Sequence, residues 1–348
     1  MHRLTLIWPL ILLGTLGGVG AYFVGLPMPF MLGGIAGAGC GVALIEARRG
    51  PADLRLPKPM REVFIAFIGT MIGASFTPDL LGVLPLFWPS VLAILLFIAV
   101  AQVGGFLIMH RIGGYSRVDA LYASMPGGLI EASILGEKAG ADAKLIAVQH
   151  FIRVLLVVFT VPFLFWALTG QVVGSAGGQG FSVRAYDFGD VTTILAVAVV
   201  GLILGKLMRL PASHMMGPLI LSAGLHVTGA IDVASPPWLL HLAQLVVGVG
   251  LGAQFSGLNA RVILRGLSVG MIAVSFMLCL SFVFAWVMGG LVPAAMTAMF
   301  LSYAPGGVTE MSLIALSLNI SPVIVAVHHL IRIVCTVFIT QALGRRLI

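Results

Sequence analysis

The chain alternates long apolar runs with short clusters of glycine, proline and charge. The runs are about 20 residues long, which is the length at which a helix crosses the hydrocarbon core of a bilayer, and they follow one another nearly end to end. They predict six helical segments in the first half, at 4–24, 28–45, 60–76, 84–109, 118–135 and 143–168. Six more are predicted in the second half, at 191–208, 215–228, 240–255, 262–288, 294–318 and 322–343.

The two sets of segments share a polar motif at one fixed offset. Each member of the motif recurs 179 positions later: Pro126-Gly127-Gly128, Glu131, His150 and Arg153 as Pro305-Gly306-Gly307, Glu310, His329 and Arg332. This self-similarity predicts an internal duplication. We divide the chain into a first membrane repeat at 1–168, a flexible Gly-rich linker at 169–190 and a second repeat at 191–348.

Glycines repeat in the same way. Gly69 and Gly73 recur as Gly248 and Gly252, again 179 positions later, and this Gly-xxx-Gly spacing predicts close helix packing. The stretch 17–32 recurs at 201–216, 184 positions later. A segment that is repeated in the body of the protein is structural, so we expect the first run to stay as a span, although its start resembles a secretory signal.

Composition places the whole chain in a membrane. Hydrophobic residues make up 59% and charged residues 9% of the 348 residues, and the mean hydropathy is +1.11. These values predict a polytopic helical membrane protein and leave no stretch for a soluble catalytic or DNA-binding domain. The three cysteines stand alone within apolar runs, which is typical of plain packing.

Charge decides between parallel and inverted halves, because Lys and Arg gather on the cytoplasmic side. If both Pro-Gly-Gly segments enter and leave on one side, sixteen Lys and Arg are cytoplasmic and only Arg184 is outside. If both segments cross, the ratio is eleven to six. The pattern therefore predicts an all-α fold of ten spans and two re-entrant hairpins, five spans and one hairpin per half. Both termini are cytoplasmic, and the second half is inverted.

Each Pro-Gly-Gly predicts a broken helix, because proline lacks a donor and glycine permits unusual dihedrals. Irregular backbone at membrane depth survives only where protein buries it or water lines it. The second half-helix begins at Gly127-Gly128 or Gly306-Gly307, where free N–H groups and the helix dipole favour negative charge. The tips of the hairpins are therefore candidate ligand contacts.

Ionisable residues near these tips are the other candidates. His150 and Arg153 lie on one helical face, about 12 and 16 Å deep in a core of about 30 Å when counted from Asp142. Ionisable groups at such depth are costly and mark a working site. The predicted substrate- or ion-binding residues are Gly127, Gly128, Glu131, His150, Arg153, Gly306, Gly307, Glu310, His329 and Arg332.

A structural alternative stays open for these charges. Glu131 with Arg153, and Glu310 with Arg332, can form buried ion pairs that only fasten each hairpin to the next span. The histidines favour a proton relay or solute contact instead, because a fixed ion pair needs no titratable imidazole beside it.

At 125–131 with 150–153, and at 304–310 with 329–332, the chain resembles the AbrB-type membrane proteins, a bacterial family with an internal duplication. The resemblance covers nearly the whole chain and implies the bacterial inner (cytoplasmic) membrane. Members of the family are labelled ammonia monooxygenase or regulator, and no settled catalytic residues can be carried over. The span count and the paired hairpins are also similar to elevator-type secondary transporters such as the citrate/sodium symporters.

The function we expect is secondary transport or export of a small polar or anionic solute by alternating access, with H⁺ or Na⁺ as the coupling ion and no other cofactor. The alternative is a membrane-embedded regulator or sensor that affects gene expression indirectly. A membrane oxidase is least favoured, because each half offers one His and one Glu as metal ligands. Direct nucleic-acid binding is not expected, because cytoplasmic loops explain the net charge of +7. The expected partners are the solute, the bilayer and, as an open option, further copies of the chain.

Overall fold

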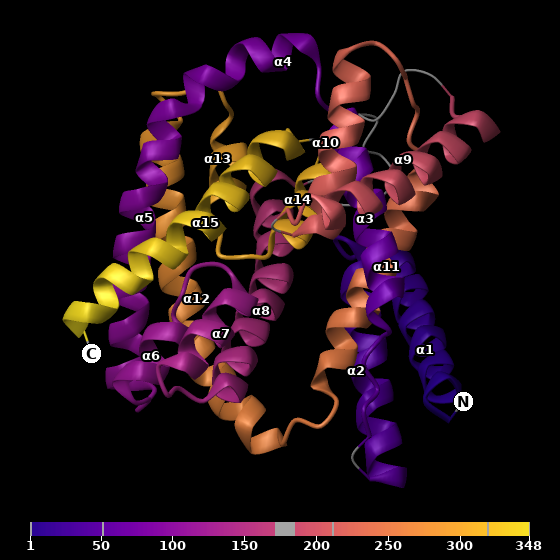
Figure 1. Cartoon of the computed structure of the whole chain (residues 1–348). Helices are drawn as coiled ribbons and strands as arrows, with labels where there is room; N and C mark the ends of the chain where they lie inside the picture. Colours follow the sequence, from indigo (N-terminus) through magenta and orange to yellow (C-terminus); the bar gives the residue numbers. More distant parts are fainter. Residues whose placement is uncertain (1, 51, 171–184, 211, 319, 348) are drawn as a thin grey trace. The chain divides into compact units, whose positions relative to one another are not determined.

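The computed structural model describes residues 2–50, 52–170, 185–210, 212–318 and 320–347 (Figure 1). Within these ranges the chain is all-helical and contains no strand. Most of the predicted linker, 171–184, lies outside them. The first-half helices are α1 (His2–Val24), α2 (Pro29–Arg49), α3 (Lys58–Ala74), α4 (Pro78–Val83), α5 (Trp88–Leu107), α6 (Arg117–Ala123), α7 (Leu129–Lys138) and α8 (Ala143–Thr169). The second-half helices are α9 (Phe188–Leu207), α10 (Ser213–Val227), α11 (Pro237–Gly252), α12 (Ala260–Met288), α13 (Met296–Tyr303), α14 (Val308–Ser317) and α15 (Pro322–Leu347). The shorter segments are η1 (Leu84–Phe87), η2 (Ile108–Ile112) and η3 (Ala253–Phe255).

Among the described residues, eight helical stretches are long and apolar enough to cross a bilayer. The chain is therefore a multi-pass membrane protein. The other two predicted spans correspond to α3 and α10, which have 17 and 15 residues. At 1.5 Å per residue these helices are about 26 and 23 Å long, less than a hydrocarbon core of about 30 Å.

The two Pro-Gly-Gly segments are broken helices, as the sequence predicts. The first helix ends at Ala123 and resumes at Leu129, and the second ends at Tyr303 and resumes at Val308. Gly128 precedes α7 with a φ of +65°, a left-handed conformation that favours glycine. We call 124–128 the first break and 304–307 the second break.

The chain forms two compact units, and each takes segments from both halves of the sequence. Unit 1 comprises Met1–Gly82, Val161–Gly257 and Ser312–Val323, and unit 2 comprises Val83–Thr160, Leu258–Met311 and Ile324–Ile348. In unit 1, α2 packs on α1 and α11, while α10 packs on α9 and α3. Figure 1 shows α1 beside α2.

Glycines bring the helices of unit 1 close together. A Cβ on Gly33 would overlap the Gly17 carbonyl, and a Cβ on Gly217 would overlap that of Gly201. The Gly-xxx-Gly pairs are confirmed as packing sites: Gly69 of α3 lies against Met215 of α10, and Gly248 of α11 against Met31 of α2. Small residues here let backbone meet backbone.

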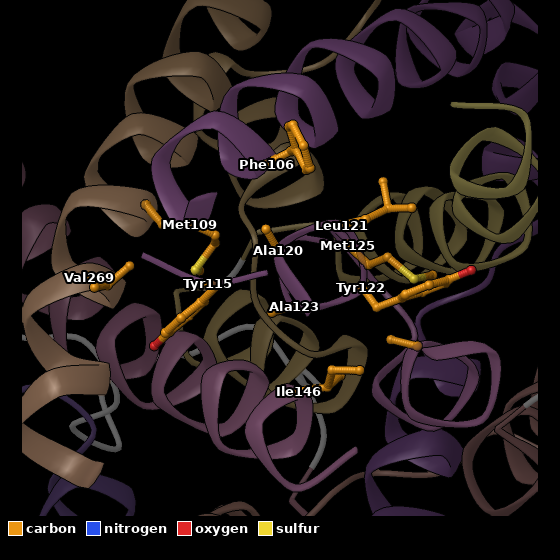
Figure 2. Close-up of a cluster of buried hydrophobic side chains, with 12 residues drawn as sticks. Phe106, Met109, Tyr115, Ala120, Leu121, Tyr122, Ala123, Met125, Ile146 and Val269 are labelled. Atoms are coloured by element: carbon orange, nitrogen blue, oxygen red, sulfur yellow. The ribbon is translucent and has the colours of Figure 1, made fainter. Parts of the chain in front are cut away.

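In unit 2, α12 packs against α5 and α13, and α6 packs against α5 and α7. A buried apolar cluster surrounds the first break (Figure 2). It joins Phe106 of α5, Leu121 of α6, Met125 of the break, Ile146 of α8 and Val269 of α12. These contacts hold the first break and the start of α8 in one core.

Candidate functional site

All ten predicted site residues lie in unit 2. Gly127, Gly128, Glu131, His150 and Arg153 belong to its first segment; the others belong to the segments that end at Met311 and begin at Ile324. α8 as far as Thr160 and nearly all of α15 lie in the same unit. The sequence-predicted residues are therefore collected in one compact part of the fold.

The glutamates lie over the starts of the second half-helices. A Cβ on Gly128 would be 2.8 Å from Oε2 of Glu131, and a Cβ on Gly307 would overlap Oε2 of Glu310. Both side chains thus fold back over the glycine that precedes their helix. Carboxylates are stabilised at this position, because a helix N-terminus carries partial positive charge.

The arginines bind the carbonyls of the breaks. Arg153 Nη1 donates to the Met125 carbonyl through a short contact. Arg332 donates to three carbonyls, from Nη1 to Tyr303 at 3.1 Å and Ala304 at 2.6 Å, and from Nη2 to Gly306 at 2.9 Å. Each guanidinium meets the C-terminal end of the first half-helix, where partial negative charge accumulates.

The contacts of Glu131 and Arg153 differ from the buried ion pair that the sequence left open as an alternative. Among the described side chains, Glu131 and Arg153 form no ion pair, and each compensates a different helix end. The C-terminal end of one half-helix and the N-terminal end of the other meet at the break. The arginine lies at the first of these ends and the glutamate at the second. The arginines therefore fasten the backbone of the breaks.

The histidines lie beside the same carbonyls. Nδ1 of His150 donates to the Ile146 carbonyl at 3.0 Å, and Nδ1 of His329 to the Val325 carbonyl at 2.9 Å. Because a carbonyl only accepts, a neutral imidazole there leaves Nε2 as an acceptor. The Met125 and Ala304 carbonyls lie near these rings. Even so, neither Nε2 has a hydrogen-bond partner within the described ranges.

Buried polar atoms without partners therefore gather at both breaks. Nε of Arg153 and Nε of Arg332 also lack partners among the residues that the structure describes. Each His–Arg pair thus offers one acceptor and one donor, three residues apart on one helical face. Buried polar atoms in this state are expected to meet a ligand or water.

The structure adds residues that the repeat alone did not reveal. Thr336 and Thr340 follow His329 and Arg332 along one face of α15, at spacings of three and four, and both are fully buried. Thr340 donates to Oε1 of Gln102, and Nε2 of Gln102 donates to the Leu121 carbonyl at the end of α6. The spacing of three and four residues after His329 was the signal in the sequence that could have revealed these two threonines. The first half has Val157 and Val161 at the matching positions, so a comparison limited to shared residues passes over them.

The position before each histidine differs between the halves, and so do its contacts. Nε2 of Gln149 donates to the Tyr115 hydroxyl at 2.5 Å. Burial raises the pKa of Tyr115, which lies in the loop between η2 and α6. In the second half, Nε2 of His328 lies 2.8 Å from the Ser90 hydroxyl of α5. Each of these side chains ties its long helix to an oxygen of another segment of unit 2.

A membrane oxidase would need metal-ligating side chains that lie close together. Over the described ranges, no three His, Cys, Asp or Glu side chains are grouped as ligands.

The family model described as transition state regulatory protein AbrB matches residues 30–348. The chain belongs to the AbrB family. It is 27% identical over 339 residues to a protein of Escherichia coli (strain K12) named "Putative regulator AbrB", covering 97% of this chain and 94% of that protein. It is 26% identical over 355 residues to "Uncharacterized protein YhjN" of Bacillus subtilis (strain 168), covering 94% of this chain and 89% of that protein. The AbrB-type resemblance is thereby confirmed over nearly the whole chain.

Proposed function

We propose that this AbrB-family protein is a secondary transporter or exporter of a small polar or anionic solute, working by alternating access in the bacterial cytoplasmic membrane. One observation carries the proposal: both breaks lie in one compact unit, and the next long helix after each break binds its carbonyls through a buried arginine. Discontinuous helices at membrane depth are typical of solute sites in secondary transporters.

The topology is part of the proposal. We infer that the two broken helices are re-entrant hairpins, that the halves are inverted, and that unit 2 carries the solute. The equivalence of the two breaks and the charge count of the loops support this arrangement.

Labelling can test the topology. In a background without Cys40, Cys279 and Cys335, single cysteines in the 169–190 linker and beside Lys138 should react from opposite faces of the membrane. Labelling of both from outside would restore full crossings and parallel halves.

Solute flux tests the function itself. Purified protein in proteoliposomes should move at least one member of a panel of organic anions, amides and amines under an imposed pH or Na⁺ gradient. Protein-free vesicles are the control. An absence of flux for the whole panel under both gradients would contradict transport.

The coupling ion follows from the same assay. We expect H⁺ rather than Na⁺, because a histidine with an unpartnered Nε2 stands beside both breaks. His150→Ala and His329→Ala should change the pH profile of flux more than the amount of folded protein. An unaltered profile in both variants would favour Na⁺.

A membrane regulator is the second candidate, because the family description and the name of the Escherichia coli relative both point to regulation. It predicts changed gene expression on deletion, without flux in vesicles.

A further inference from the structure

The two breaks differ at their first glycine, although the Pro-Gly-Gly sequence is the same. A Cβ on Gly306 would lie 2.6 to 2.8 Å from the Met311 side chain, so the space beside this glycine is already filled. A Cβ on Gly127 would lie at ordinary contact distances, 3.6 Å from Ile333 and 3.7 Å from Oγ1 of Thr336. The residue that matches Met311 is Ala132. The first break therefore keeps a space of about one methyl group against α15.

An unpartnered hydroxyl borders this space. Thr336 is 0% exposed, and its Oγ1 has no hydrogen-bond partner in the part of the chain that the structure describes. A buried hydroxyl without a partner is costly, so it is retained where a ligand completes it. The matching residue of α8 is Val157, which has no hydroxyl to offer.

The surroundings select a negative ligand. α7 has ten residues, and its first N–H groups have no acceptor within the helix, so its start carries partial positive charge. Arg153 holds the carbonyl of Met125, two residues before Gly127. Arg332 stands one helical turn before Thr336, with Nε unpartnered among the described residues. The side chain that already lies at this helix end, Glu131, is itself a carboxylate.

We propose that the first break, and not the second, is the solute site, and that it binds the carboxylate of a small organic acid between Gly127 and the Thr336 hydroxyl. One carboxylate oxygen takes the methyl-sized space, and the solute displaces the Glu131 carboxylate from the start of α7. This inference rests on the proposed transport function and narrows its solute to a carboxylate.

Binding is measured apart from transport. The purified wild-type protein in detergent is titrated at pH 7 with acetate, lactate, succinate and citrate, and the midpoint of thermal unfolding is followed at constant ionic strength. Acetamide and methylammonium are the neutral and cationic comparisons. At least one carboxylate should raise the midpoint with saturation. No shift with any of the four acids, or an equal shift with acetamide, would overturn the assignment.

Two variants then locate the site. Thr336→Val removes the hydroxyl, and Gly127→Ala fills the space without a backbone penalty, because the φ of Gly127 is not positive. Thr336→Val should raise the dissociation constant about tenfold or more, the usual effect of losing a hydrogen bond to a charged group. Gly127→Ala should also raise it, because the added methyl group occupies the space of the carboxylate oxygen. Val157→Thr, the mirror change on α8, should leave it within about twofold. Unchanged binding in both Thr336→Val and Gly127→Ala would overturn the site.

Folding and transport are separated by two further readouts. If Thr336→Val folds poorly, Thr336→Ser should regain both the hydroxyl and the binding, while Gly127→Ala tests the same space independently. Flux of the acid that binds is measured in proteoliposomes. Binding that these variants abolish, without wild-type flux, would leave the site standing and contradict transport. Flux that neither variant changes would leave transport standing and remove the site.

Discussion

α8 and α15 carry the same His-x-x-Arg pair, but only α15 continues it as a polar stripe. After Arg332 come Thr336 and Thr340 on the same face, whereas valines follow Arg153 at the matching positions. Arg332 also binds three carbonyls and Arg153 one. The shared pair fastens a break in each half, and the added hydroxyls distinguish one long helix from the other. The two long helices are therefore alike in how an arginine binds a break and unlike in the hydroxyls that follow it.

The largest effect should come from the arginines. Arg332→Met leaves three buried carbonyls without their donor and should cost about 3–5 kcal/mol of stability. Arg153→Met leaves one and should cost about 1–3 kcal/mol. The midpoint of unfolding in detergent and the folded yield measure both. Equal losses would show that the two fastenings are alike.

The glycines of the breaks give the next effect. Gly306→Ala forces Met311 to move and should cost about 1–3 kcal/mol, whereas Gly127→Ala meets only ordinary contacts and should cost less than about 0.5 kcal/mol. Adding Met311→Ala should relieve the strain of Gly306→Ala. A greater loss from Gly127→Ala than from Gly306→Ala would contradict the open first break.

Thr340 tests the far end of the polar stripe. Thr340→Val removes the donor to Oε1 of Gln102 and should cost about 1–2 kcal/mol, because a buried acceptor is left unpaired. Thr340→Ser keeps the hydroxyl and is the control. If Thr340→Val is as stable as Thr340→Ser, the hydrogen bond contributes nothing.

The smallest effect is a coupling close to zero. Because Glu131 and Arg153 act on different helix ends, the losses in Glu131→Gln and Arg153→Met should add to within about 0.5 kcal/mol in the double variant. A double-mutant cycle in thermal unfolding measures this. Recovery of stability in the double variant would restore the ion pair as the fastening.

Most of the helices could be predicted, because apolar length and Gly and Pro punctuation are local signals. Both breaks lie at Pro-Gly-Gly, and the first helix begins within a few residues of its predicted start. The segment expected at 84–109 is longer than its apolar run: helix begins at Pro78, where the Thr77 hydroxyl accepts from the Leu80 N–H at 3.2 Å. That capping residue lies outside the apolar pattern.

The partners of the site residues could not be predicted in the same way. Opposite side-chain charges suggested Glu131 for Arg153, but the guanidinium binds a backbone carbonyl. The partial charges at helix ends come from backbone groups and not from any residue type. The sequence therefore does not show where they lie until the ends of the helices are placed in space. The Thr336 hydroxyl was missed for a related reason: its meaning comes from Gly127, about 200 positions earlier in the chain.

The short helices α3 and α10 pack against each other, and Ser222 of α10 donates to the Thr70 carbonyl of α3 at 2.8 Å. In the topology that we propose, these two neighbouring helices of 17 and 15 residues cross the membrane and create a hydrophobic mismatch with an ordinary bilayer. A helix shorter than the hydrocarbon core is accommodated by local thinning of the bilayer, so we expect the acyl-chain length of the lipid to affect the protein. The solute flux that we propose should therefore vary with acyl-chain length in reconstituted vesicles, and thinner bilayers should favour it.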